Sequence, residues 1–242
     1  MRRDIIAGLE TVITGGPDRE GGGDGPLVVL LHGFGAPGDD LVPLWRMLDV
    51  PESVRFVFPS GPLRLSMGMG DSRAWWMLDM DRLIRERTSG NWMTLIKEVP
   101  EGLGAAREQV ARFVAELEHR LAVAPQHMLL GGFSQGAILA CDLVLRSEQP
   151  FAGMILLSGT IIAYDEWMSR IPARRGMPVF QSHGTDDPIL AYEVAQQLRE
   201  AFRAGGLEVE WHEFRGGHEI PLLVLERLGL FIRRVFSGAS PT

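Results

Sequence analysis

Short apolar runs alternate with segments of helical periodicity along most of the chain. The runs are predicted strands, and they fall near 9–14 and at 27–31, 54–58, 128–131, 154–157, 179–181 and 207–211. The run at 27–31, Leu-Val-Val-Leu-Leu, has no polar position, which is typical of a strand buried on both faces of a sheet. The chain therefore predicts a sheet whose central strands are covered on both sides.

Three segments carry apolar residues every three or four positions, as amphipathic helices do. Their apolar stripes are Leu103, Ala106, Val110, Phe113, Val114, Leu117 and Leu121; Val194, Leu198, Ala201 and Phe202, before Gly205; and Leu225, Leu228 and Ile232, after Pro221. Gly205 stands where a helix would end, and Pro221 suits a first helical turn. Strands that alternate with helices predict one α/β domain over 1–242, with a mostly parallel central sheet and helices on both faces.

The segment 63–100 does not follow this alternation. It is rich in Met and Trp but has no clean strand or helix period. We therefore interpret it as an excursion from the sheet, of the kind that often covers a site, and expect it to lie over the active site.

Composition limits the choice of partners and compartment. The 242 residues hold 24 Lys+Arg and 31 Asp+Glu, for a net charge of −7, which argues against nucleic acid or an anionic membrane held by bulk charge. The single cysteine, Cys141, cannot form an intramolecular disulfide. Asp4 and Glu10 interrupt any apolar run near the N-terminus, and no window is long enough for a membrane span. These features predict a cytoplasmic protein with no membrane span.

Candidate chemistry centres on Ser134. The sequence Gly132-Phe133-Ser134-Gln135-Gly136 matches the G-x-S-x-G turn, in which small flanking residues allow a strained strand-to-helix turn that projects the serine hydroxyl. A predicted strand precedes the motif, and an apolar segment suited to a buried helix follows it. The alternative is a serine in a tight turn with no chemistry.

A serine nucleophile needs a histidine base, and in this architecture the base comes last in the chain. Only His183, His212 and His218 lie after Ser134. His183 precedes every acid of its own loop, and His212 shares the polar face of a predicted strand, where we expect it to be solvated. His218 lies in a glycine-flanked loop between the last strand and the last helix, and is the predicted base.

The acid that orients the histidine should lie in the loop after the preceding core strand. That loop contains Asp186 and Asp187, followed by Pro188. Pro188 holds the residue before it in an extended conformation, which favours Asp187 as the acid. Asp186 stays an alternative, with Asp187 then acting as a helix cap.

The remaining candidates surround this site. Acyl transfer needs donors for an oxyanion, and the predicted donors are the main-chain N–H groups of Gln135, after the nucleophile, and Phe34, in the loop after the first core strand. We interpret His32 as a turn residue. A deformable apolar substrate pocket is predicted from six residues of the excursion: Met67, Met69, Trp75, Trp76, Met77 and Leu78. A local core packed by these six residues is the alternative interpretation. No clustered metal-ligand spacing is present, and no metal is expected.

Taken together, these motifs resemble the phospholipase/carboxylesterase family of the α/β-hydrolase superfamily, which includes the acyl-protein thioesterases. The matching pieces, in family order, are LLHGFG at 30–35, FPSGP at 58–62, RAWWMLDM at 73–80, GGFSQGA at 131–137, SHGTDDP at 182–188 and GGH at 216–218. The chain departs from the family in Ala137, where members commonly have glycine, and in its second tryptophan and longer Met-rich segment.

The resemblance implies a catalytic triad of Ser134, Asp187 and His218, with the aspartate directly before proline as the acid. It also implies an oxyanion hole from the main chain of Phe34 and Gln135, and no cofactor. The expected function is a serine carboxylesterase that hydrolyses acyl esters through an acyl-serine intermediate. Alternatives are a thioesterase acting on acyl-protein or acyl-CoA thioesters, a lysophospholipase, and, in a different class, a binding protein with a vestigial site. The expected partner is a small acyl ester or thioester, and a homodimer is an open possibility.

Overall fold

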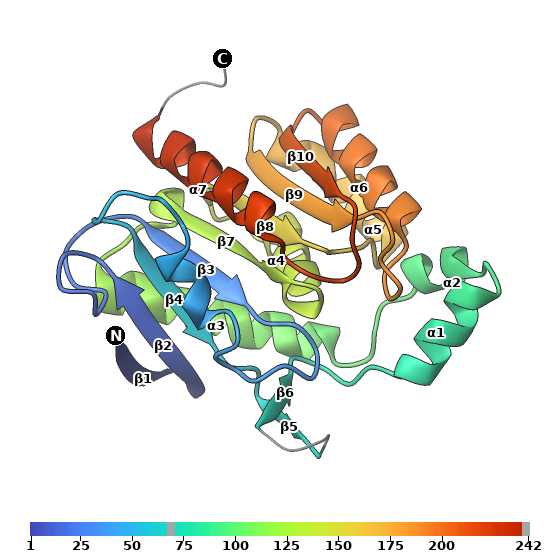
Figure 1. The fold of residues 1–242 in the computed structure, drawn as a ribbon, viewed down its shortest axis with the longest axis horizontal. Helices are drawn as coiled ribbons and strands as arrows, with labels where there is room; N and C mark the ends of the chain where they lie inside the picture. Colours follow the sequence, from blue (N-terminus) through green and yellow to red (C-terminus); the bar gives the residue numbers. More distant parts are fainter. Residues whose placement is uncertain (67–70, 239–242) are drawn as a thin grey trace.

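The fold is built around an eight-stranded sheet, seen in a computed structural model that describes residues 1–66 and 71–238 (Figure 1). Its strands, in spatial order, are β1 (Arg2–Ile6), β2 (Leu9–Gly15), β4 (Arg55–Pro59), β3 (Leu27–Leu31), β7 (Met128–Phe133), β8 (Gly153–Leu157), β9 (Pro178–Gly184) and β10 (Glu208–Phe214). Strand β2 is antiparallel to both neighbours, and every pairing from β4 to β10 is parallel. The predicted mostly parallel sheet is confirmed.

Helices cover both faces of the sheet, as predicted. One face carries α3 (Leu103–Leu121), α4 (Gln135–Arg146), α5 (Tyr164–Arg170) and α6 (Tyr192–Ala204), and the other carries α7 (Leu222–Ser237) and a short 3-10 turn (Val42–Arg46) (Figure 1). Along β3, Leu27, Val29 and Leu31 pack in the first layer, while Val28 and Leu30 pack in the second. The apolar run has no polar position because both of its faces are buried.

The first strand, β1, is an element that the sequence pattern did not predict. It pairs with β2 through a two-residue turn, in which Ala7 and Gly8 have φ of 47° and 80°. Positive φ at both turn residues is typical of a type I′ hairpin. Only Ile6 of this strand is buried, so its sequence has no apolar run to detect.

In the described residues of the segment 63–100 there are four short elements: β5 (Leu63–Leu65), β6 (Ser72–Ala74), α1 (Met80–Thr88) and α2 (Trp92–Lys97). Strands β5 and β6 form a separate antiparallel hairpin, and the two helices project from the end of the molecule where α5 and α6 lie (Figure 1). The Glu98 carbonyl, just after α2, accepts a hydrogen bond from the Ala163 N–H at 2.9 Å. This bond ties the end of the segment to the chain that precedes α5.

A buried carboxylate joins three helices behind the sheet. Asp142 in α4 is fully buried, and it accepts hydrogen bonds from Arg107 of α3 at 2.8 Å, from Arg146 at 2.9 Å and from the Trp167 indole of α5 at 2.9 Å. All three donors depend on this one carboxylate, so an apolar side chain at position 142 would leave all three without their acceptor.

We therefore expect Asp142→Ala to lower the free energy of unfolding by about 3 kcal/mol, because two guanidinium groups and a buried indole lose their acceptor. Urea denaturation followed by tryptophan fluorescence measures the change. The control is Asp165→Ala, an exposed carboxylate of α5, which should change stability by less than about 0.5 kcal/mol. Equal losses of stability in the two variants would contradict the role of Asp142 as the shared acceptor of the three helices.

Candidate active site

Ser134 lies at the sharp turn between β7 and α4. Its φ of 53° and ψ of −118° are unusual for a residue with a side chain, and the Leu157 carbonyl fixes the turn by accepting the Ser134 N–H at 2.9 Å. A Cβ at Gly132 would stand 2.3 Å from the Leu31 carbonyl oxygen, and one at Gly136 would stand 2.0 Å from it. The two glycines are therefore required for the elbow to pass so close to β3.

Asp187 and His218 meet across two loops. Asp187 follows β9, His218 lies between β10 and α7, and the imidazole Nδ1 donates to Asp187 Oδ2 at 2.7 Å. The other oxygen, Oδ1, accepts the N–H groups of Ile189 at 2.8 Å and Leu190 at 2.9 Å. Asp187 is only 2% exposed, whereas Asp186 is exposed and, in the described part of the chain, makes no hydrogen bond or ion pair with His218. The structure thus brings Asp187, and not its neighbour, to the histidine.

The Asp187 carboxylate is held in its charged form. Burial alone raises the pKa of Asp187, but the hydrogen bond and charge of His218, with the N–H groups of Leu190 and Ile189, outweigh burial, so that this pKa lies below its ordinary value. A carboxylate can only accept, so Nδ1 of His218 carries a proton and Nε2 of the neutral ring is left with a free lone pair.

The other two candidate histidines lie elsewhere. The buried His183 has Nε2 at 3.1 Å from the Leu190 carbonyl and at 3.3 Å from Asp187 Oδ2, and it is not among the residues that line the pocket with Ser134. His212 is half-buried: it pairs with Glu210 at 2.9 Å and packs on the Phe180 ring. His212 is therefore only partly solvated: its side chain is 22% exposed, and its partner Glu210 also binds Arg234 of α7.

Ser134 and His218 line one pocket of about 560 Å³. The Phe133 ring packs against the imidazole, with ring centres 4.7 Å apart. Within the described residues, Ser134 Oγ makes no hydrogen bond to His218. Hydrogen bonds of this kind commonly tighten only when substrate is bound. What the structure shows is that both side chains face one pocket, where a single ligand can reach both.

Two main-chain segments border the serine. Gln135 is the first residue of α4, where the N–H has no partner within the helix, and Phe34 lines the same pocket from the loop after β3. His32 controls the peptide before Phe34: its Nε2 accepts the Gly61 N–H at 2.8 Å, so Nδ1 carries the proton and donates to the Gly33 carbonyl at 2.7 Å. Burial lowers the pKa of His32 and keeps it neutral. Because a trans peptide directs its carbonyl and N–H oppositely, fixing one also fixes the other.

The pocket wall includes part of the predicted set. Trp76, Met77 and Leu78 line it, but Trp75 does not, since its indole faces His32 and donates to the His32 carbonyl at 3.0 Å. The assignment of Trp75 to the pocket is thereby corrected. Met67 and Met69 lie outside the described residues.

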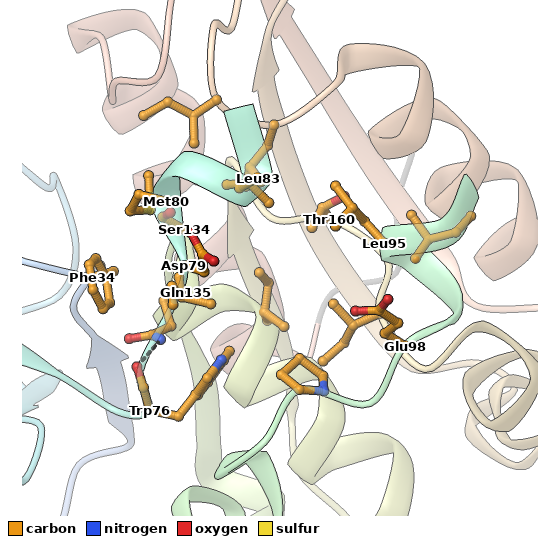
Figure 2. A pocket seen from close by; sticks show the side chains of 18 of the residues that line it. Phe34, Trp76, Asp79, Met80, Leu83, Leu95, Glu98, Ser134, Gln135 and Thr160 are labelled. Atoms are coloured by element: carbon orange, nitrogen blue, oxygen red, sulfur yellow. Dashed lines mark hydrogen bonds between the residues drawn. The ribbon is translucent and has the colours of Figure 1, made fainter. Parts of the chain in front are cut away.

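Much of the remaining wall comes from residues that sequence reasoning missed. They include Met80 and Leu83 of α1, Trp92 and Leu95 of α2, and Thr160, Ile161 and Ile189 from loops of the main body. Figure 2 labels Leu83 and Leu95 together with Ser134 and Gln135 among the side chains that line this pocket. Five of the missed residues, Met80, Leu83, Trp92, Leu95 and Ile189, are apolar and half-buried, because they border an open pocket rather than a packed core.

Two other kinds of site are absent from the described part of the chain. Among residues 1–66 and 71–238, no group of three His, Cys, Asp or Glu side chains is arranged to hold a metal ion. Within the same residues, no helix has the length and apolarity to span a bilayer.

Fold and site together define the class: this chain is an α/β-hydrolase, and a hydrolase of the serine esterase type. It belongs to the phospholipase/carboxylesterase family, whose family model matches residues 21–236. It is 26% identical over 216 residues to acyl-protein thioesterase 1 of Gibberella zeae, with 86% of this chain and 89% of the relative covered.

Two further comparisons agree with this membership. The chain is 25% identical over 221 residues to carboxylesterase SOBER1 of Arabidopsis thaliana, with 89% of this chain and 93% of the relative covered. Among solved structures it is similar to esterase PE8, with a TM-score of 0.77 at 27% identity, covering 94% of this chain and 99% of the other.

Proposed function

We propose that this protein is a carboxylesterase that hydrolyses acyl esters through an acyl-serine intermediate at Ser134. The observation that carries the proposal is the pair of buried Asp187 and half-buried His218, joined at 2.7 Å, whose imidazole lines the same apolar pocket as the strained serine. A non-catalytic binding protein would have no need of a desolvated carboxylate held against a histidine at a nucleophile elbow.

The proposed reaction has two steps. His218 Nε2 takes the Ser134 proton as Oγ attacks the ester carbonyl, and then protonates the leaving alcohol as the acyl-serine forms. Water, activated by the same imidazole, attacks the acyl-serine and releases the carboxylic acid and the free serine. Asp187 stays ionised throughout and stabilises the imidazolium.

The negative oxygen of each tetrahedral intermediate is assigned to the main-chain N–H groups of Phe34 and Gln135. The N-terminus of α4 adds its dipole, which favours negative charge at this position. Because backbone donors are fixed before the reaction, they need little reorganisation as charge develops.

The acyl group is assigned to the apolar part of the pocket. Trp76, Leu83 and Leu95 provide apolar walls, and a volume of about 560 Å³ lies within the range of small-molecule sites. We assign the segment 63–100 the role of a cap over the active site, within a single domain, because its residues from Trp76 onward line one side of this pocket.

A thioesterase is the second candidate, favoured by the relatives named acyl-protein thioesterase 1. Esters and thioesters share the acyl-serine intermediate and differ only in the leaving group, so the triad geometry serves both. Kinetics on matched pairs of substrates therefore decide between them.

The test is hydrolysis of p-nitrophenyl esters over a series of acyl lengths at neutral pH, with S-acyl thioesters of the same acyl groups in parallel. We expect turnover that a fluorophosphonate abolishes, with the label on Ser134. A higher kcat/KM for esters than for matched thioesters supports the carboxylesterase, and the reverse supports the thioesterase. An inert Ser134 with no ester hydrolysis would favour the binding protein.

Trp76 should shape the choice of acyl group. It is only 2% exposed and its ring lines the pocket, so Trp76→Ala is expected to raise kcat/KM for long acyl chains relative to butyrate by about tenfold, the range that one pocket-filling group controls. The substitution should also lower the melting temperature, since a buried aromatic ring is lost. Trp45→Ala, on the other face of the sheet, is the control and should leave the substrate ratio unchanged. An unchanged ratio in Trp76→Ala would assign the ring to packing alone.

A further inference from the structure

We infer that the side chain of Gln135 is a positioning residue, which sets the spacing between the two oxyanion donors through the segment 72–76. The inference rests on the proposed function and concerns the carboxamide, not the main-chain N–H of the same residue. The proposed acyl-transfer mechanism uses only the main-chain N–H of Gln135, and the inference assigns a role to its buried side chain.

The Gln135 carboxamide is 1% exposed and makes two hydrogen bonds to consecutive residues. Its Oε1 accepts the Trp75 N–H at 3.0 Å, and its Nε2 donates to the Trp76 carbonyl at 2.9 Å. Figure 2 shows the second bond as a dashed line between the labelled Gln135 and Trp76. One main-chain donor and one main-chain acceptor fix the orientation of the amide, which at neutral pH can accept through Oε1 and donate through Nε2 at the same time.

The same segment is bonded on its other side to the loop that carries Phe34. The Trp75 indole donates to the His32 carbonyl at 3.0 Å. Arg73 exchanges two main-chain hydrogen bonds with the loop: its carbonyl accepts the Gly35 N–H at 2.8 Å, and its N–H donates to the Ala36 carbonyl at 2.9 Å. The segment 72–76 is therefore paired with residues on both sides of Phe34.

These bonds form a bridge between two distant parts of the chain. One donor, Phe34, follows β3, and the other, Gln135, begins α4. Both must lie within about 2.7–3.1 Å of one developing oxygen, so the separation between the two N–H groups matters more than the position of either alone. The bridge through 72–76 holds that separation, and the carboxamide is its attachment to the elbow.

A packing role alone would not call for this side chain. An apolar residue of similar length would fill the same volume without the desolvation of an amide. The two hydrogen bonds of the carboxamide go to main-chain groups of Trp75 and Trp76, so they fix the position of that backbone rather than fill space.

The test compares Gln135→Met and Gln135→Glu with the wild type on p-nitrophenyl acetate, a substrate too short to depend on the distal pocket. Gln135→Met keeps the length and loses both bonds, and should lower kcat about 10- to 100-fold with KM changed less than about threefold. In Gln135→Glu, the carboxylate repels the Trp76 carbonyl, whereas the protonated carboxyl can both accept and donate. Its kcat relative to wild type should therefore rise as pH falls from 8 to 5.

Two further variants separate positioning from stability. Leu117→Ala, in the buried face of α3, destabilises the fold away from the site and should keep kcat within about twofold below its melting temperature. Trp75→Phe keeps an aromatic ring beside His32 but removes the indole N–H that bonds the His32 carbonyl, so it should lower kcat by severalfold even if the Gln135 variants do not fold.

The outcomes distinguish the inference from the function on which it rests. If the wild type hydrolyses the ester through Ser134 while folded Gln135→Met and Trp75→Phe keep its kcat within about twofold, the positioning role is overturned and the esterase stands. If the wild type shows no turnover that depends on Ser134, both are overturned. A fall in kcat for both variants, without a matching fall in Leu117→Ala, supports the bridge.

Discussion

Replacing Ser134 by alanine is expected to lower kcat for p-nitrophenyl esters by about 10⁶-fold, with little change in substrate affinity. The pocket, the main-chain donors and the Asp187–His218 pair all remain, but no hydroxyl is left to form the acyl intermediate. Alanine tolerates the φ of 53° no worse than serine does, so the fold should be unaffected.

A matched control exists one strand away. Ser158, at the end of β8, is also buried and also has a positive φ, of 48°. Ser158→Ala makes the same chemical change in a similarly strained turn, and should keep kcat within about twofold. Steady-state kinetics and active-site titration with a fluorophosphonate measure both variants. Similar losses in the two variants would indicate a general disturbance of the strand ends, and would remove the special role of Ser134.

The three proposed catalytic residues could be selected from the sequence because each follows a predicted strand of a parallel sheet. The carboxyl ends of the parallel strands β7, β9 and β10 lie at the same end of the sheet, so loops far apart in sequence converge there. Between Asp186 and Asp187, the residues alone favour Asp187 without excluding its neighbour, and the family resemblance points to the aspartate before Pro188. In the structure the loop buries Asp187 and leaves Asp186 exposed, and Asp187 is the one that bonds His218.

The pocket was harder to predict for a physical reason. Side chains such as Leu83 and Leu95 face an open pocket, so their spacing follows the shape of that pocket rather than the period of a helix packed on a sheet. The same reasoning explains the error at Trp75. Two neighbouring tryptophans pointed to one apolar site, but their rings face different surroundings, and composition carries no information about direction.

Asp187→Asn is expected to lower kcat by about 10⁴-fold at neutral pH, the second largest effect. The amide can keep its oxygen toward the N–H groups of Ile189 and Leu190, so the loop should hold its shape. Its NH₂ group then faces His218 Nδ1 and requires that nitrogen to accept. The proton moves to Nε2, which can no longer take the proton of Ser134.

The control is the neighbouring substitution, Asp186→Asn, which removes the same charge from an exposed side chain. It should keep kcat within about twofold, while thermal melting shows both variants folded. Because the defect in Asp187→Asn is a wrong tautomer rather than a lost group, raising the pH should not restore it to the wild-type rate. A large loss in Asp186→Asn with activity retained in Asp187→Asn would reverse the assignment of the acid and make Asp187 a helix cap.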